Sequence, residues 1–141
     1  SKAWGAAGLR VGICVAAPAL TGWLNRMRAP YNIGSATQRA AAELLGDGER
    51  FRREVATIRR ERERMKRVLR GMRGAEVVGD SQANFVLARV ADHERVAGYL
   101  RRRGVMVRMR HEPPLLAGCL RLTVGTREEN DLLYELLNEC L

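Results

Sequence analysis

The sequence contains no apolar run long enough to cross a lipid bilayer. The best candidate, Val11 to Leu20, falls short of the roughly 18 residues that a spanning helix needs, and it contains Pro18. The first residues also lack the long apolar core and the cleavage site of a secretory signal. We therefore expect no membrane span and a cytoplasmic location.

Cysteine and histidine are scarce. The three cysteines, Cys14, Cys119 and Cys140, are widely spaced, form no Cys-x-x-Cys pair and are accompanied by only two histidines. An odd number of cysteines without short spacings disfavours both a disulfide framework and a zinc site. We expect reduced thiols and no bound metal.

The sequence also has few aromatic residues, whereas its charge is strongly one-sided. Aromatic residues make up 5% of the chain, and the formal net charge is +9. A basic excess can indicate nucleic-acid binding, but proteins that bind single strands usually stack the bases on aromatic side chains. The arginines here cluster beside glutamates in stretches of helical periodicity, which favours solvated helix faces. We expect no nucleic-acid partner, and anionic small molecules fit the charge equally well.

The first 50 residues are patterned as a strand followed by two helices. The segment 9–18 is apolar and rich in β-branched residues, which predicts a buried strand. Apolar residues then recur at helical spacing up to Pro30. A second helix is expected to begin at Ser35 or Thr37 and to end at Gly46.

A long amphipathic helix is predicted to begin near Gly48 and to end at Gly71 or Gly74. Apolar residues recur at steps of three, four and seven, and Arg62 alone interrupts the stripe. Glutamate and arginine fill the remaining faces, which we interpret as solvated. The stripe consists of Phe51, Val55, Ile58, Met65, Leu69 and Met72.

The pattern from about residue 76 onward indicates a small α+β domain of order β-β-α-β-β-α. It begins with two strands around a turn at Gly79 and Asp80, followed by a helix that Asp92 caps. Two further strands precede a closing helix. Thr126 and Glu129 have the spacing of a capping box at the start of this last helix.

The opening stretch, SKAWGAAGLRVG, combines an amine with groups that can bind phosphate. Lys2 follows Ser1, glycines occupy positions 5 and 8, and Arg10 lies close behind. A lysine amine forms a Schiff base with a carbonyl compound when it is partly desolvated. A hydroxyl, backbone amides and a guanidinium suit a phosphate carried by that compound. The alternative is an ordinary solvated lysine.

This stretch resembles the cofactor-lysine segment of the fold-type I, pyridoxal-phosphate-dependent aminotransferases. Within that superfamily the chain is most similar to the histidinol-phosphate aminotransferases, and the similarity runs in order along nearly all 141 residues. Three further segments carry it: RAPYNI at 28–33, SQANFVLAR at 81–89 and GVMVRMRHEPPLLAGCLRLTVGTREEN at 104–130. The resemblance implies an α/β fold, in which the end of a large domain is followed by a long helix and a small α+β domain.

The resemblance also implies roles around the cofactor, pyridoxal 5'-phosphate. Lys2 would hold the cofactor through a Schiff base and, once released, would move the proton from the substrate α-carbon to the C4′ carbon of the cofactor. Ser1 and Arg10 would bind the phosphate group of the cofactor.

Four further residues would contact the substrate by the same resemblance. Arg121 would bind its anionic end, and Arg108 would bind the phosphate of histidinol phosphate. Tyr31 would line the substrate pocket, and Asn84 would lie near it. From the residues alone, Arg108 could be a solvated arginine, and Tyr31 and Asn84 could be structural. Arg121 alternates with two leucines of a predicted strand, so it should face away from their side.

The implied reaction moves an amino group between glutamate and imidazole acetol phosphate, which gives histidinol phosphate and 2-oxoglutarate. The intact enzyme would be a homodimer, and this chain would be its C-terminal portion. We expect residues 1–50 to end the large domain, 51–75 to form the connecting helix and 76–141 to form the small domain. A sister aminotransferase acting on aromatic substrates, an inactive C-terminal portion and a basic nucleic-acid binder remain alternatives.

Overall fold

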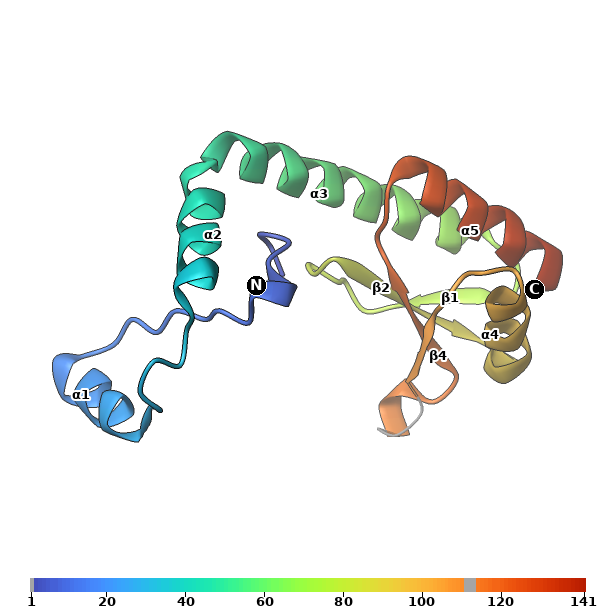
Figure 1. The fold of residues 1–141 in the computed structure, drawn as a ribbon. Coiled ribbons are helices and arrows are strands. Elements are labelled where there is room, and N and C mark those ends of the chain that lie inside the picture. Colours follow the sequence, from blue (N-terminus) through green and yellow to red (C-terminus); the bar gives the residue numbers. More distant parts are fainter. Residues whose placement is uncertain (1, 111–113) are drawn as a thin grey trace. The chain divides into compact units, whose positions relative to one another are not determined.

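The computed structural model describes residues 2–110 and 114–141. The chain forms two compact units, Ser1–Val55 and Ala56–Leu141, and each is described by itself. The long helix α3, Gly48–Gly71, belongs to both units (Figure 1). The assignment of residues 1–50, 51–75 and 76–141 to the end of a large domain, a connecting helix and a small domain stays a prediction.

Over its described residues, 2–55, the first unit contains short helices and no sheet. A single 3-10 turn, η1 (Ala7–Leu9), is followed by α1 (Pro18–Met27) and α2 (Ser35–Gly46). The two predicted helices are therefore confirmed. Pro18 occupies the first turn of α1, where the missing N–H costs no hydrogen bond.

The strand predicted for 9–18 is wrong. Residues 11–17 adopt neither helix nor strand, and the side chains of Ile13 and Val15 are 73% and 93% exposed. A strand is stable only when a neighbouring strand pairs with its backbone groups. The strands described in this chain all belong to the second unit and pair with one another there, so the apolar pattern of this segment finds no sheet.

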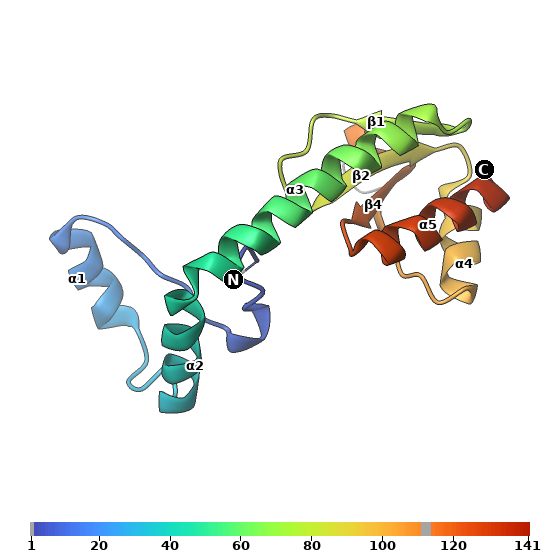
Figure 2. The ribbon, with the colours of Figure 1, turned by 90° about the horizontal axis from the view of Figure 1, so that it is seen from above.

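The second unit is a four-stranded antiparallel sheet packed against helices (Figures 1 and 2). The strand order is β1-β2-β4-β3, and the α+β order predicted from the sequence is confirmed. The strands are β1 (Ala75–Val78), β2 (Phe85–Val90), β3 (Arg108–Arg110) and β4 (Cys119–Thr123), and the helices are α4 (His93–Arg102) and α5 (Arg127–Cys140).

One face of the sheet forms the core with α3, α4 and α5. Alternate residues of β2 and β4 are buried on this face, including Val86, Leu120 and Leu122. Met65 of α3 and Leu100 of α4 pack against them. The opposite face of the sheet therefore carries the intervening residues, among them Arg121.

The predicted helix caps are present. The side chain of Asp92 accepts a hydrogen bond from the backbone N–H of Arg95 at 3.1 Å. The backbone N–H of Thr126 donates to Glu129 at 2.8 Å, and the N–H of Glu129 donates to the Thr126 hydroxyl at 3.3 Å. This reciprocal pair fixes the start of α5.

Charged residues of α3 depart from the expected pattern. Glu61, Arg62 and Lys66 are only 3%, 6% and 1% exposed. The prediction that glutamate and arginine outside the apolar stripe are solvated is therefore wrong for Glu61, whereas Arg62 is buried with the stripe that it interrupts. Buried charges persist only when they are paired and hydrogen-bonded. Their partners lie at the end of the sheet where β2 begins and β4 ends.

Two further observations concern membranes and metals. Over residues 2–110 and 114–141, no helix is both long and apolar enough to cross a membrane. Within the same ranges, no three side chains of histidine, cysteine, aspartate or glutamate gather in a way that could hold a metal ion.

Candidate functional site

Two arginines lie directly opposite one another on the face of the sheet that points away from the core. Arg108 of β3 is the cross-strand partner of Arg121 of β4, and Leu87 of β2 is the partner of Arg121 on its other side. Directly opposite residues share a face, with Cβ atoms about 5 Å apart. The predicted orientation of Arg121, away from its neighbouring leucines, is thus confirmed.

Within residues 2–110 and 114–141, this arginine pair has no compensating acid. Among the residues that the structure describes, neither Arg108 nor Arg121 forms an ion pair, and the buried Nε of Arg121 has no hydrogen-bond partner. Like charges placed directly opposite one another destabilise a sheet, and an unsatisfied buried donor costs about 1–3 kcal/mol. The guanidinium of Arg121 does lie 5.3 Å from the centre of the Phe85 ring. An anion bound between the two arginines would remove both costs.

Arg89 on the same face provides a contrast. Its guanidinium forms an ion pair with Glu76 at 2.8 Å and donates to the carbonyl oxygens of Ala117 at 3.3 Å and Leu115 at 3.2 Å. These bonds connect β2 to β1 and to the segment that leads into β4. Arg89 is therefore a structural arginine, whereas Arg108 and Arg121 have no such partners among the described residues.

Two further residues of this face, Arg110 and Phe85, were not predicted from the sequence. Arg110 alternates with Arg108 in β3 and is the partner of Cys119, so it adds a further guanidinium to the face, beside those of Arg89, Arg108 and Arg121. Phe85 lies two residues before Leu87 and contacts Arg121. The period-two alternation in RMR and FVL contained the signal for both.

Asn84 lies at the end of the sheet near Arg121. Its carbonyl oxygen accepts a hydrogen bond from the backbone N–H of Val124 at 2.9 Å, and the next residue, Phe85, pairs with Thr123. Thr123 is two residues from Arg121 on β4. The second unit thus brings the predicted residues Asn84, Arg108 and Arg121 to one region of the sheet.

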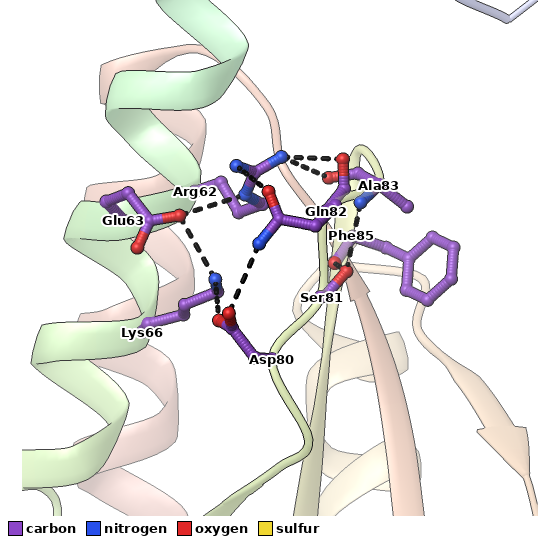
Figure 3. Close-up of polar contacts among 8 residues, drawn as sticks. All are labelled: Arg62, Glu63, Lys66, Asp80, Ser81, Gln82, Ala83 and Phe85. Atoms are coloured by element: carbon purple, nitrogen blue, oxygen red, sulfur yellow. Dashed lines mark hydrogen bonds and ion pairs between the residues drawn. The ribbon is translucent and has the colours of Figure 1, made fainter.

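Buried charges of α3 fasten the segment that leads to Asn84 (Figure 3). Arg62 donates to the carbonyl oxygens of Gln82 at 2.7 Å and Ala83 at 3.3 Å, and to the Gln82 side chain at 3.2 Å. Lys66 donates to Asp80 at 2.6 Å and to Glu63 at 3.0 Å. Asp80, Gln82 and Ala83 are therefore hydrogen-bonded to the helix.

These bonds shift the pKa values of the groups involved. The hydrogen bond to Asp80 raises the pKa of Lys66 more than burial lowers it, and the same bond lowers the pKa of Asp80. Hydrogen bonds from Lys66 and Arg62 lower the pKa of Glu63. Lys66, Asp80 and Glu63 therefore stay ionised near neutral pH.

A second buried pair fastens the other side of the same sheet end. Glu61 accepts hydrogen bonds from Asn130 at 3.2 Å and from Arg64 at 3.0 Å. Asn130 also bonds both backbone groups of Gly125, just after β4, at 3.0 and 3.1 Å. Burial alone would raise the pKa of Glu61, but the bonds from Asn130 and Arg64 outweigh it and lower the value.

The first unit contains the predicted cofactor lysine on an exposed turn. The carbonyl oxygen of Lys2 accepts a hydrogen bond from the N–H of Gly5 at 3.2 Å, and Gly5 has a φ of +61° that favours glycine. Trp4 stacks on Phe51 with ring centres 4.1 Å apart. This contact attaches the turn to the start of α3.

Arg10 ends the same loop. It has a left-handed backbone with φ of +53°, and its guanidinium donates to the carbonyl oxygen of Ala7 at 3.0 Å. The guanidinium and the Lys2 side chain are exposed on one short loop, which fits a cofactor that carries both an aldehyde and a phosphate. Ser1, the other predicted phosphate ligand, lies outside the described residues.

Tyr31 also belongs to the first unit. It has a φ of +53° and is fully exposed (100%). A non-glycine residue in this conformation is uncommon and marks a tight turn after α1. Its predicted place in a substrate pocket remains a prediction.

The chain belongs to the aminotransferase class I and II family, whose model matches residues 1–137. This assignment agrees with the mixed fold and with the arginine pair on the open face of the sheet.

Its relatives narrow the comparison further. The chain is 40% identical to the histidinol-phosphate aminotransferase of Flavobacterium johnsoniae over 96% of its length, and 41% identical to that of Parabacteroides distasonis over 94%. It spans only 39% of the length of each. A solved structure of histidinol-phosphate aminotransferase from Sinorhizobium meliloti, in complex with pyridoxal-5'-phosphate, superposes with a TM-score of 0.88 at 26% identity, covering 99% of this chain and 39% of that one.

Proposed function

We propose that the chain provides the cofactor lysine and the substrate arginines of a histidinol-phosphate aminotransferase. In this function it takes part in the transfer of an amino group between glutamate and imidazole acetol phosphate, which gives histidinol phosphate and 2-oxoglutarate. Its family and the names of its relatives support the reaction class. The intact enzyme is proposed to be a cytoplasmic homodimer.

The cofactor role falls to the opening loop. Pyridoxal 5'-phosphate supplies the electron sink that makes the substrate α-proton acidic. Lys2 would hold this cofactor and accept the α-proton through its amine, and Ser1 and Arg10 would bind the cofactor phosphate. The exposure of Lys2 and Arg10 on one loop supports this assignment.

The single observation that carries the substrate assignment is the pairing of Arg108 with Arg121. Two guanidiniums directly opposite one another, without an acid among the described residues, form a site for a doubly charged anion. Histidinol phosphate carries a phosphate, and glutamate carries two carboxylates. One pair of arginines would therefore serve both halves of the reaction, with Tyr31 and Asn84 beside the substrate.

The test is a calorimetric titration of the chain with histidinol phosphate and with histidinol, which lacks the phosphate. We expect histidinol phosphate to bind at least about tenfold more tightly, since a guanidinium–phosphate pair is a charge-assisted bond. Arg108→Gln should remove this preference. Arg101→Gln is the matched control, because Arg101 is exposed on α4 and forms no ion pair among the described residues.

Two outcomes would contradict the assignment. If Arg108→Gln weakened the binding of histidinol phosphate and of an aromatic amino acid equally, Arg108 would not be a phosphate ligand. A sister aminotransferase with aromatic substrates would then be favoured. If the control variant lost as much affinity as Arg108→Gln, the binding would reflect the net charge of the chain rather than the arginine pair.

A further inference from the structure

We propose that Arg62 is a positioning residue for the anion site at Arg121, an inference that rests on the proposed function. It acts through the segment 82–85, which it fastens to α3. No role for a residue of α3 follows from the motifs of the sequence, where Arg62 is only an interruption of an apolar stripe.

Arg62 is a buried arginine whose guanidinium is hydrogen-bonded to the backbone of another segment. Its side chain is 8% exposed, and its guanidinium donates to two consecutive backbone carbonyl oxygens, those of Gln82 and Ala83. Its only ion-pair partner among the described residues is Glu63, at 3.1 Å, whose side chain is 53% exposed. The buried charge is therefore compensated mainly by the backbone of residues 82 and 83.

These carbonyl groups directly precede the site. Asn84 follows Ala83 and bonds Val124, and Phe85 follows Asn84 and lies against the guanidinium of Arg121. The hydroxyl of Ser81 also donates to the Phe85 carbonyl oxygen at 2.6 Å, so a hydrogen bond joins the two ends of the segment 81–85. Figure 3 shows the Phe85 ring beyond the bonded residues 82 and 83. A displacement of these two residues would therefore move both the Asn84 side chain and the ring that supports Arg121.

The planar fork of arginine is required for this arrangement. Nη1 reaches both carbonyl oxygens while Nη2 reaches the Gln82 side chain. A lysine has one nitrogen on a flexible stem and cannot satisfy the same set of acceptors at once. Arg62→Lys therefore keeps the charge but loses part of the positioning, whereas Arg62→Met loses both.

The experiment is a titration of the ¹⁵N-labelled full chain with inorganic phosphate, followed by the Nε–H signal of Arg121 and the side-chain amide signal of Asn84. In the wild type both signals should shift on a common binding curve. We expect Arg62→Met to weaken the affinity for phosphate about tenfold and Arg62→Lys about threefold. In both variants the Arg121 signal should be displaced from its wild-type position before any phosphate is added. Arg59→Met, which removes the same charge from an exposed position of α3, should bind within twofold of the wild type.

Each outcome separates this inference from the proposed function. If the wild type shows no shift at Arg121, the proposed anion site fails. If the wild type binds but Arg62→Lys binds equally well with an undisplaced Arg121 signal, the positioning role is overturned. If Arg62→Met does not fold, Arg62→Lys decides, with folding monitored by its backbone amide spectrum. If Arg59→Met weakens phosphate as much as Arg62→Met, the effect is general electrostatics, and the inference is again overturned.

Discussion

The hydroxyl of Tyr134 is a polar group buried in the core. The residue is 6% exposed, and among the described residues its oxygen has no hydrogen bond. Burial raises its pKa to about 12, and the guanidinium of Arg64 lies 5.3 Å from the centre of its ring. The ring contributes to the core, whereas the hydroxyl contributes a desolvation cost.

Tyr134→Phe is therefore expected to stabilise the chain at pH 7 by about 1 kcal/mol. The variant also removes a pH dependence. In the wild type the unfolded tyrosine ionises near pH 10 and the folded one near pH 12, so stability falls as the pH rises through this window. Urea denaturation at pH 7 and pH 10.5 measures both effects.

Tyr99→Phe is the matched control for this prediction. The hydroxyl of Tyr99 bonds Glu139, so its removal deletes a satisfied hydrogen bond and should lower stability at pH 7. A loss of stability in Tyr134→Phe of the same size would mean that its hydroxyl is satisfied, which would contradict the assignment of an unpaired group.

At the scale of elements, α3 carries an ion pair whose contribution should depend on pH. The folded pKa of Asp80 lies below 3.8 because of its bond with Lys66, so this stabilisation is present above pH 3.8 and is lost as the pH falls through the folded value. The folded pKa of Lys66 lies above 10.5, so the stabilisation by this pair is fully present below pH 10.5 and is lost as the pH rises through the folded pKa.

Asp80→Asn tests this pair. We expect the variant to be less stable at pH 7, because Glu63 is then the one charged partner of the buried Lys66 among the described residues. It should also lose less stability than the wild type below pH 4. Thermal melts from pH 2.5 to pH 7 provide the measurement. Glu94→Gln, an exposed carboxylate on α4, is the control and should follow the wild-type profile. Parallel profiles for Asp80→Asn and the wild type would contradict the pair.

The helices could be predicted from the sequence because their signals are local. Periodicity and capping residues predict α1, α2, α4 and α5 closely, and the T-x-x-E spacing predicts the capping box at Thr126. The strand at 9–18 was wrongly predicted because an apolar run reports a tendency to be buried, whereas a strand also needs a partner.

The candidate site could be predicted only in part. Alternation along β4 correctly predicts the face of Arg121, because side-chain direction in a strand follows from position alone. The register that places Arg108 opposite Arg121 is a long-range pairing that no local pattern contains. The burial of Arg62 likewise depends on the carbonyl groups of residues 82 and 83, twenty positions away in the sequence.

At the scale of the whole molecule, burial is distributed unequally between the two units. The side chains that are buried all lie at or after Glu61, and none of residues 2–55 is buried. The first unit instead exposes large apolar side chains, including Trp23 at 63% and Met27 at 83%. Hydrophobic burial is the main source of folding free energy, so the two units should differ strongly in local stability.

Hydrogen exchange of the full chain tests this difference. We expect the amides of β2 and β4 to exchange at least about a thousandfold more slowly than those of α1, because the strands lie in the core and the α1 side chains do not. The experiment should be run at two chain concentrations, tenfold apart. Equal protection of α1 and β2 at both concentrations would contradict the prediction and show that the first unit is stable by itself. Protection of α1 that appears only at the higher concentration would mean that a second copy of the chain covers Trp23 and Met27, since only association depends on concentration.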